Sequence, residues 1–444
     1  MHHSIFDILE KEDLNRLTIG HDWRTGTCHV SSGKMWDHST VWANYNKIFS
    51  TSTPLTSDAV CHGAASTRAL FRKHGALDYL ESVIELLRKG QHHCIDCFFD
   101  NKNNIRFMNN VHSDVLGVNN RSHALRAGGI RRHGLDEEEY EVIIDGLNLS
   151  RGMSFKNFAA RIPYGGCKMT VMMEPVRLDD MGALGFLAYA LDMSRAFTGP
   201  DMGFPTELAD VLKEHFTRNI TGGPGGPLGA TGTPTAFGTY RAVGQAVRFV
   251  KGSPSLRGAK IAVQGLGAVG VPLCEHYIRE GAALVVTDID PDIVDRFCST
   301  HQDADIEVVP PQDILFVEAD VFSPCATGGI LTMDLIPRLR FKIIMGAANN
   351  QLKASSREEE CSLARELQRH GILFQVAWWH NLGGVLCGRE EYEMQHEASM
   401  DNVLARVEQI CTDHTWSNLT ESHQLGITPT EHAYASAENV IYQA

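Results

Sequence analysis

Short hydrophobic runs alternate with amphipathic segments over the second half of the chain. Each run predicts a buried strand, and the segments between the runs have hydrophobic residues at helical spacing. The runs are residues 260–264, 283–287, 306–309, 321–322, 343–345 and 373–376. Because regular strand–helix alternation is typical of a parallel, doubly wound sheet, this part of the chain predicts an α/β fold.

The first half of the chain shows a mixed pattern. Residues 78–89 carry hydrophobic side chains at helical spacing, and Gly90 ends this predicted helix. Residues 98–111 predict a hairpin with its turn at 100–104. Residues 136–160 predict a long helix, whose acidic start suits the positive end of the helix dipole. The buried stripe expected on this helix consists of Val142, Ile143, Leu147 and Met153.

A segment dense in glycine and proline, residues 221–232, lies between these two patterns and predicts a loop or hinge. The chain has 444 residues, which is too long for one ordinary core. A helix is expected at 234–250 after the hinge, and the tail from 391 to 410 is helical again. We therefore predict two domains.

Three glycines follow the first strand of the doubly wound region. Gly265 permits a tight turn, Gly267 lets the backbone approach a pyrophosphate, and Gly270 lets the next helix pack closely on the strand. The following strand ends in Asp288, whose carboxylate can accept hydrogen bonds from ribose hydroxyls and would repel a 2′-phosphate. A glycine-rich turn alone can be purely structural, but this context predicts a dinucleotide site that favours NAD. The turn also includes Ala268 and Val269.

Two lysines stand in apolar or glycine-rich surroundings before the hinge. Lys156 ends the segment 152–156, and Lys168 follows Gly165, Gly166 and Cys167. Loss of solvent lowers the pKa of an ammonium group, which suits acid–base chemistry. A single lysine is usually a solvated surface charge, whereas two in this setting favour a catalytic segment. Asp201 lies in a glycine-flanked turn, where it is either a functional carboxylate or simple turn chemistry.

Composition narrows the partners. The formal net charge of −14 disfavours nucleic acid and anionic membranes as main partners. The 11 scattered cysteines indicate reduced thiols, and no signal peptide or membrane span is visible, so we expect a cytoplasmic protein. Cys94 and Cys97 form a CxxC pair next to His92 and His93, but one pair without a second is a weak zinc signal. We expect no metal.

Ordered motifs from about residue 105 to 385 resemble the glutamate/leucine/phenylalanine/valine dehydrogenase superfamily, with a site pattern closest to its phenylalanine and leucine types. The motifs are Gly128–Arg131, Gly152–Asn157, Gly165–Lys168, Thr235–Gly238, the glycine turn with Asp288, Pro324–Ala326, Ala348–Leu352 and Asn381–Val385. Such an ordered series is far more specific than a glycine turn alone.

The resemblance implies a reversible reaction of an L-amino acid, water and NAD(P)⁺ to a 2-oxo acid, ammonia and NAD(P)H. It implies that Lys156 holds the substrate carboxylate, that Lys168 activates water, and that Asp201 exchanges protons with the amino group. Thr235 and Asn349 are candidates for holding the nicotinamide half of the cofactor. Cys325 and Ala326 are further cofactor candidates from their motif.

The implied fold is a substrate domain facing an NAD-binding domain across a cleft. Residues 1–232 would form the substrate and oligomerisation domain, with helices of residues 389–444 returning to it. Residues 233–388 would form the dinucleotide-binding domain. In relatives the N-terminal region builds subunit contacts, so we expect a homo-oligomer. Residues 1–90, and an apparent insertion at 118–126, match no motif.

Two positions bear on the substrate. Glutamate-specific members carry a lysine before the glycine pair and a serine three residues past Val385, whereas Ala127 and Gly388 stand there in this chain. A buried glutamate carboxylate would then lack a cationic partner. Leucine-type enzymes place larger aliphatic groups at both positions. The space left here favours phenylalanine or tryptophan. The candidate substrate-binding residues are Lys156, Gly128, Gly129, Met153, Ala127, Val385 and Gly388.

Several alternatives stay open. One is a branched-chain dehydrogenase acting on leucine or valine, and another is a catalytically silent NAD-binding scaffold, against which the presence of both Lys168 and Asp201 speaks. Trp378 and Trp379 either refill part of the pocket or belong to the core. His380 is either a substrate contact or a structural histidine. A hydroxy-acid dehydrogenase would need a His–acid dyad near the NAD domain, and no arrangement points to one.

Overall fold

A computed structural model describes residues 4–48, 54–113 and 124–442, so most of the predicted insertion at 118–126 lies outside the described residues. The chain divides into two compact units. The first comprises residues 1–158, 162–229 and 391–396, and the second comprises residues 159–161, 230–390 and 397–444. The division at residue 229 falls within the predicted hinge segment.

The C-terminal helices differ from the expectation that residues 389–444 return to the first unit. Only residues 391–396 do so. Helix α13 (Met400–Leu425) packs instead along α8 (Gly232–Lys251). A Cβ atom on Gly238 of α8 would come within 2.9 Å of Cys411 of α13, so the two helices approach closely where that side chain is missing.

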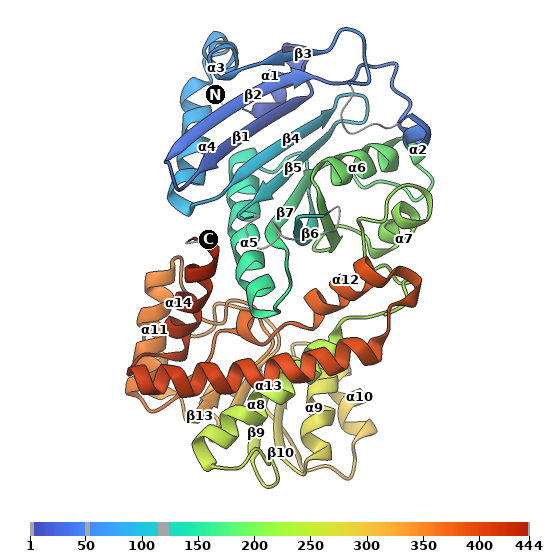
Figure 1. The fold of residues 1–444 in the computed structure, drawn as a ribbon. Helices are drawn as coiled ribbons and strands as arrows, with labels where there is room; N and C mark the ends of the chain where they lie inside the picture. The colour runs from blue at the N-terminus through green and yellow to red at the C-terminus, as the bar shows by residue number, and fades with distance from the viewer. Residues whose placement is uncertain (1–3, 49–53, 114–123, 443–444) are drawn as a thin grey trace. The chain divides into compact units, whose positions relative to one another are not determined.

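The first unit is built on an eight-stranded mixed sheet with the order β3-β2-β1-β4-β5-β7-β6-β8 (Figure 1). Strand β6 runs parallel to both of its neighbours, and the other pairs are antiparallel. The strands are β1 (Arg16–Asp22), β2 (Thr27–Lys34), β3 (Val60–His62), β4 (Cys94–Asp100), β5 (Ile105–Val111), β6 (Arg126–His133), β7 (Gly165–Met172) and β8 (Ala196–Pro200).

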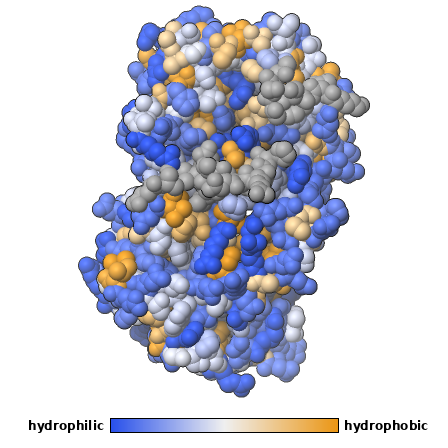
Figure 2. All heavy atoms as spheres, viewed as in Figure 1, coloured by the Kyte–Doolittle hydropathy of each residue, from blue (hydrophilic) through white to orange (hydrophobic). Residues whose placement is uncertain are grey.

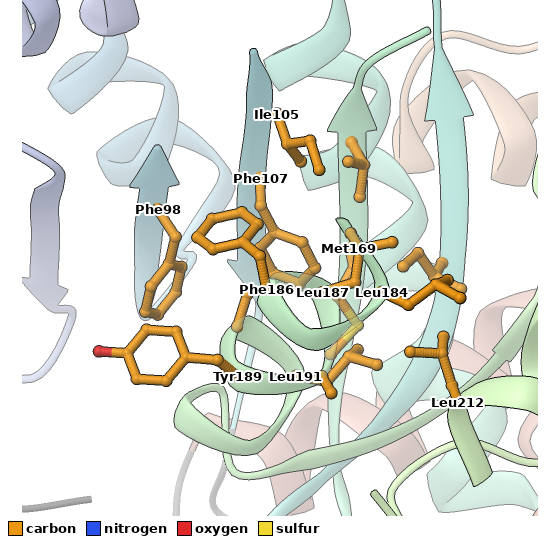
Figure 3. Close-up of a cluster of buried hydrophobic side chains, with 14 of the residues drawn as sticks. Phe98, Ile105, Phe107, Met169, Leu184, Phe186, Leu187, Tyr189, Leu191 and Leu212 are labelled. Atoms are coloured by element: carbon orange, nitrogen blue, oxygen red, sulfur yellow. The ribbon is translucent and has the colours of Figure 1, made fainter. Parts of the chain in front are cut away.

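Helices pack on both faces of this sheet. They are α1 (Ile5–Lys11), α2 (Tyr45–Ile48), α3 (Ala64–Lys73), α4 (Leu77–Gly90), α5 (Glu139–Ala159), α6 (Met181–Met193) and α7 (Thr206–His215). An aromatic and aliphatic core joins α6 to β4, β5 and β7, with Phe186 and Tyr189 beside Phe98 and Phe107 (Figure 3). A second core holds Val142, Ile143 and Leu147 of α5, whereas Met153 is only half-buried.

The second unit contains a six-stranded parallel sheet with the order β11-β10-β9-β12-β13-β14, as the alternating pattern predicts. Its strands are β9 (Lys260–Gln264), β10 (Ala283–Thr287), β11 (Ile306–Val308), β12 (Ala319–Pro324), β13 (Phe341–Ile344) and β14 (Leu373–Phe374). Its helices, besides α8 and α13, are α9 (Gly270–Arg279), α10 (Pro291–Thr300), α11 (Arg357–Arg369), α12 (Gly383–Met394, which runs into the first unit at residue 391) and α14 (Pro429–Ile441).

The surface shown in Figure 2 is mostly hydrophilic, with small and scattered hydrophobic patches. Among the residues that the structure describes, no helix is long and apolar enough to cross a membrane.

Candidate functional site

Two adjacent strands of the first unit carry the glycine pair and a buried lysine. In the β6–β7 pairing, Gly129 lies opposite Lys168. A Cβ atom on Gly129 would come within 2.6 Å of Lys168 Nζ, so glycine leaves room for the ammonium group. A Cβ atom on Gly128 would instead meet the Cys167 carbonyl oxygen at 2.0 Å. The glycine pair therefore lets Lys168, which is 5% exposed, lie against the β6 backbone.

Asp201 follows β8, which pairs with the other edge of β6. Its backbone nitrogen donates a 2.9 Å hydrogen bond to the Ile130 carbonyl oxygen, which fixes the turn beside β6. Its Oδ2 forms an ion pair with Lys168 Nζ. The structure thus brings together the two residues that the sequence predicts to be catalytic.

Burial and mutual charge shift the titration of this group. Burial lowers the pKa of Lys168, although the neighbouring Asp201 carboxylate opposes that shift. Burial alone would raise the pKa of Asp201, but the charge and hydrogen bond of Lys168 outweigh it and leave the pKa below its usual value. A lysine with a lowered pKa beside an ionised carboxylate is suited to moving protons near neutral pH.

Lys156 lies near the end of α5. Burial and the nearby Lys168 cation lower its pKa to about 8. The helix packs very closely on β7, because a Cβ atom on Gly166 would come within 2.2 Å of the Ser154 nitrogen. Asn157 adds hydrogen bonds to the carbonyl oxygens of Ala127 (3.2 Å) and Gly165 (2.9 Å), which fix the ends of β6 and β7. Asn157 belongs to the motif Gly152–Asn157, but its role could not be predicted from the sequence.

Sequence reasoning also missed two charged residues around Asp201. The Arg131 guanidinium lies 3.1 Å from Asp201 Oδ2 and 3.0 Å from Asp145 Oδ2. Arg131 belongs to a recognised motif, but Asp145 lies on α5, and nothing in its spacing indicates that it meets the site.

The predicted substrate-binding residues are divided between the two units. Ala127 is buried on β6, and because residues two apart on a strand share a face, it lies on the same side as Gly129 and the Lys168 ammonium. Met153 is half-buried on α5. Val385 and Gly388 are half-buried and stand almost one turn apart on α12, before the point where this helix enters the first unit.

The glycine turn of the second unit has the geometry that its sequence predicts. Gly265 has φ 95°, which favours glycine, and its missing Cβ would come within 2.8 Å of the Ala326 Cβ. A Cβ on Gly270 would meet the Gly265 carbonyl oxygen at 1.9 Å, so α9 can begin directly against the turn. A Cβ on Gly267 would meet nothing within 4 Å, which leaves open space above the turn.

This turn fits a pyrophosphate. No side chain among the described residues caps the N-terminus of α9, so the positive end of its helix dipole can face an anion. The Val271 nitrogen itself donates to the Gly267 carbonyl oxygen at 3.1 Å, and Pro272 has no N–H group. Asp288 follows β10 and is half-buried. Its Oδ2 accepts a 2.7 Å hydrogen bond from the Leu266 nitrogen in the turn.

The other predicted cofactor residues line the same edge of the parallel sheet or begin α8. Cys325 donates from its backbone nitrogen to the Gln264 carbonyl oxygen at 2.7 Å, and Ala326 follows against Gly265. Asn349 is exposed and lines an open cavity of about 670 Å³ with Asn350, Gly328 and Gly329. Thr235 lies in the first turn of α8, where its hydroxyl donates to the Thr231 carbonyl oxygen at 2.9 Å.

Several contacts of residues 378–380, for which the sequence left two roles open, lie within the second unit. Trp379 is buried and donates from Nε1 to the His414 carbonyl oxygen at 3.1 Å, and Trp378 packs on the Tyr434 ring. His380 is fully buried, with Nε2 3.0 Å from the Gly346 carbonyl oxygen. These contacts favour a structural role for the segment.

Cys94 and Cys97 both lie on β4 and are buried. Within the described ranges, no group of three or more histidine, cysteine or acidic side chains is arranged to hold a metal ion.

The mixed sheet with its lysine–carboxylate pair, and the parallel sheet with its glycine turn and acidic residue, together define a nucleotide-dependent amino-acid dehydrogenase. No protein-family model matches the chain. Leucine dehydrogenase from Thermoactinomyces intermedius is 38% identical over 265 residues, covering 58% of this chain and 69% of that protein. Valine dehydrogenase from Streptomyces coelicolor is 30% identical over 362 residues, covering 80% of this chain and 94% of that protein.

A solved structure extends the likeness to the fold. The crystal structure of L-tryptophan dehydrogenase from Nostoc punctiforme superposes with a TM-score of 0.68 at 27% identity and covers 81% of this chain and 98% of that one. The chain belongs to the Glu/Leu/Phe/Val dehydrogenase superfamily of NAD(P)-dependent amino-acid dehydrogenases.

Proposed function

We propose that this enzyme catalyses the NAD-dependent, reversible oxidative deamination of an L-amino acid with a bulky apolar or aromatic side chain, phenylalanine or tryptophan. The products are the 2-oxo acid and ammonia. The observation that carries the substrate class is Ala127, a buried small residue on the sheet face that also holds the Lys168 ammonium. A substrate side chain that reaches position 127 meets a methyl group and not the lysine that glutamate-specific members carry there, so a second carboxylate is disfavoured.

The chemistry follows from the three polar groups of the first unit. The Lys156 ammonium binds the substrate α-carboxylate. Asp201 takes a proton from the substrate amino group, and NAD⁺, when bound, supplies the hydride acceptor for Cα. Lys168, whose pKa is lowered by burial, activates the water that adds to the resulting iminium carbon, and ammonia leaves after Asp201 returns a proton to nitrogen. Each of these groups acts at a different atom of the substrate.

Asp288 supports NAD over NADP, because its carboxylate would repel a 2′-phosphate on the adenosine ribose. Thr235 and Asn349 would hold the nicotinamide half, and Cys325 with Ala326 would border the turn. The cofactor proposal is tested by comparing initial rates with NAD⁺ and NADP⁺, and a clear preference for NADP⁺ would contradict it.

The second candidate is a branched-chain dehydrogenase, which the likeness to leucine and valine dehydrogenases favours. Turnover of phenylalanine, tryptophan, leucine, valine and glutamate with NAD⁺ separates the two. We expect the aromatic substrates to have the highest kcat/KM. Ala127→Leu should shift that preference towards leucine, because it places a larger aliphatic side chain on the sheet face that holds Lys168. A preference of the wild type for glutamate would refute the proposal that Ala127 and Gly388 exclude a second carboxylate. A preference for leucine or valine would favour the second candidate.

We also infer a homo-oligomer from the resemblance, since the N-terminal region of relatives builds subunit contacts. Here that region supplies β1, β2 and β3 at one end of the mixed sheet. Light scattering on the purified protein tests this, and a monomer at micromolar concentration would contradict it.

A further inference from the structure

Arg131 joins two carboxylates at the catalytic end of the mixed sheet. Its Nε and Nη2 lie 3.2 Å and 3.1 Å from Asp201 Oδ2. Its Nη1 lies 3.1 Å and 3.0 Å from the two oxygens of Asp145. The guanidinium is planar and rigid, so a group clamped at both ends in this way fixes the orientation of each carboxylate.

The clamp acts on one oxygen of Asp201. Lys168 Nζ also reaches Oδ2, so three donor atoms from two cations converge on that single atom. Because the two oxygens of a carboxylate lie in one rigid plane, holding Oδ2 also fixes the direction in which Oδ1 points. Because the Arg131 side chain is only 16% exposed, solvent screens this arrangement weakly.

The position of Arg131 follows from the strand pattern. Every second residue of β6 points to the same face of the sheet. This face, on which Lys168 lies, therefore carries Gly129, Arg131 and His133. Asp145 reaches that face from α5. Arg131 thus lies between the acid of the site and an acid of the helix that also carries Lys156.

We propose that Arg131 is a positioning residue for the deamination reaction, which presents Oδ1 of Asp201 to the substrate amino group and keeps that carboxylate ionised, and that Asp145 anchors it. The inference rests on the amino-acid dehydrogenase activity and not on the choice of substrate. Among the described residues, Lys168 on β7 and Arg131 on β6 contact Asp201 directly, and Lys156 on α5 lies near enough to interact with it through charge. Behind Arg131 lie Asp145 on α5 and His133 on β6, and Glu137 pairs with His133.

The test is the pH profile of kcat/KM for Arg131→Met, measured with whichever amino acid the wild type turns over best. Without the cation, Asp201 should protonate more readily, so the acidic limb should move up by about one pH unit. Misorientation of the carboxylate should lower kcat by about 10- to 100-fold. Arg131→Lys keeps the positive charge but loses the planar set of guanidinium donors. It should therefore restore the position of the acidic limb more fully than it restores kcat.

Two further variants separate positioning from folding. Arg106→Met removes an arginine of similar burial that pairs with Asp7 elsewhere on the same sheet, and it should leave kcat and the limb unchanged. Asp145→Asn should lower kcat while the acidic limb does not rise, because the charge of Arg131 remains beside Asp201.

The proposal would be overturned if Arg131→Met kept the acidic limb of the wild-type pH profile and lost activity only in proportion to its loss of folded protein. Arg131 would then be a structural residue. A wild type that turns over no amino acid is a different result: it would refute the proposed function, and the role of Arg131 with it.

Discussion

The Leu266 nitrogen donates a 2.7 Å hydrogen bond to Oδ2 of Asp288, so the glycine turn after β9 is tied to the end of β10. The other oxygen, Oδ1, accepts a 3.0 Å hydrogen bond from the Asp290 nitrogen. The carboxylate that we assign to the ribose hydroxyls therefore also holds the turn that would approach the pyrophosphate. A single side chain therefore bears on both the ribose and the pyrophosphate positions of the predicted nucleotide site.

Asp288→Asn should weaken NADH binding by about tenfold, because a charged acceptor for the ribose and for Leu266 is replaced by a neutral one. It should also narrow the difference between NAD⁺ and NADP⁺, since the repulsion of a 2′-phosphate is lost. Fluorescence titration with NADH and NADPH measures both effects. Asp292→Asn, at an exposed acid of α10, is the control. If the ratio of NADH to NADPH affinity did not change in Asp288→Asn, Asp288 would not determine the preference for NAD.

The two glycines Gly267 and Gly270 should respond differently to alanine. A Cβ at Gly270 would overlap the Gly265 carbonyl oxygen, so Gly270→Ala should reduce the free energy of unfolding by about 1–3 kcal/mol and weaken NADH binding. A Cβ at Gly267 has open space, so Gly267→Ala should leave stability unchanged and weaken only cofactor binding. Thermal unfolding with and without NADH distinguishes the two. If Gly267→Ala bound NADH normally, the pyrophosphate would not lie over this residue.

Lys168→Ala should lower turnover by about 10²- to 10⁴-fold, because it removes the group that we assign to water activation. NADH binding should persist, since the lysine and the glycine turn lie in different units. Steady-state kinetics and NADH fluorescence check the two halves of this prediction. Near-normal turnover in the variant would refute the catalytic role.

Lys156 predicts a pH-dependent KM. Its pKa of about 8 means that the ammonium is present below that pH and is lost as the pH rises through it. The KM of the 2-oxo acid should therefore rise above about pH 8, by up to about tenfold per pH unit, while kcat changes less. Using the 2-oxo acid avoids titration of the amino group of the amino acid, and ammonia kept saturating at every pH excludes an effect of its own titration.

Lys156→Gln should have a high KM that no longer varies over this range. Lys89→Gln, an exposed lysine of α4, serves as a control that should keep the wild-type dependence. A KM of the wild type that stays flat to about pH 10 would contradict carboxylate binding by Lys156.

The central strands of the second unit could be predicted because their buried residues appear as continuous apolar runs. The edge strand β11 differs, since Glu307 and Val308 are exposed. Strand β6 could not be predicted. Its residues include Arg126, Gly128, Gly129, Arg131 and Arg132, a series with no strand-like alternation of hydrophobic residues. It is a strand because β7 and β8 pair with it on both sides. Tertiary pairing overrides local preference here, as is common for strands.

The candidate site divides in the same way. Lys156, Lys168 and Asp201 could be found because motifs mark them. The contact between Arg131 and Asp145 depends on how α5 lies over β6, and that relationship leaves no signal in the spacing of the two residues. The end of α5 also departs from the expected stripe, since Met153 is half-buried while Ser154 and Phe155 are buried.

The return of residues 391–396 to the first unit has a consequence for synthesis of the chain. Tyr392 stacks on Phe197 at 4.5 Å between ring centroids, and Glu391 pairs with Lys213 at 2.5 Å. The ribosome makes these partners nearly two hundred residues apart, so the first unit acquires its last pieces only after residues 230–390 of the second unit have been translated. A fragment ending at the hinge would expose Phe197, and nascent protein at that stage is the form in which this unit is most open to chaperones and proteases.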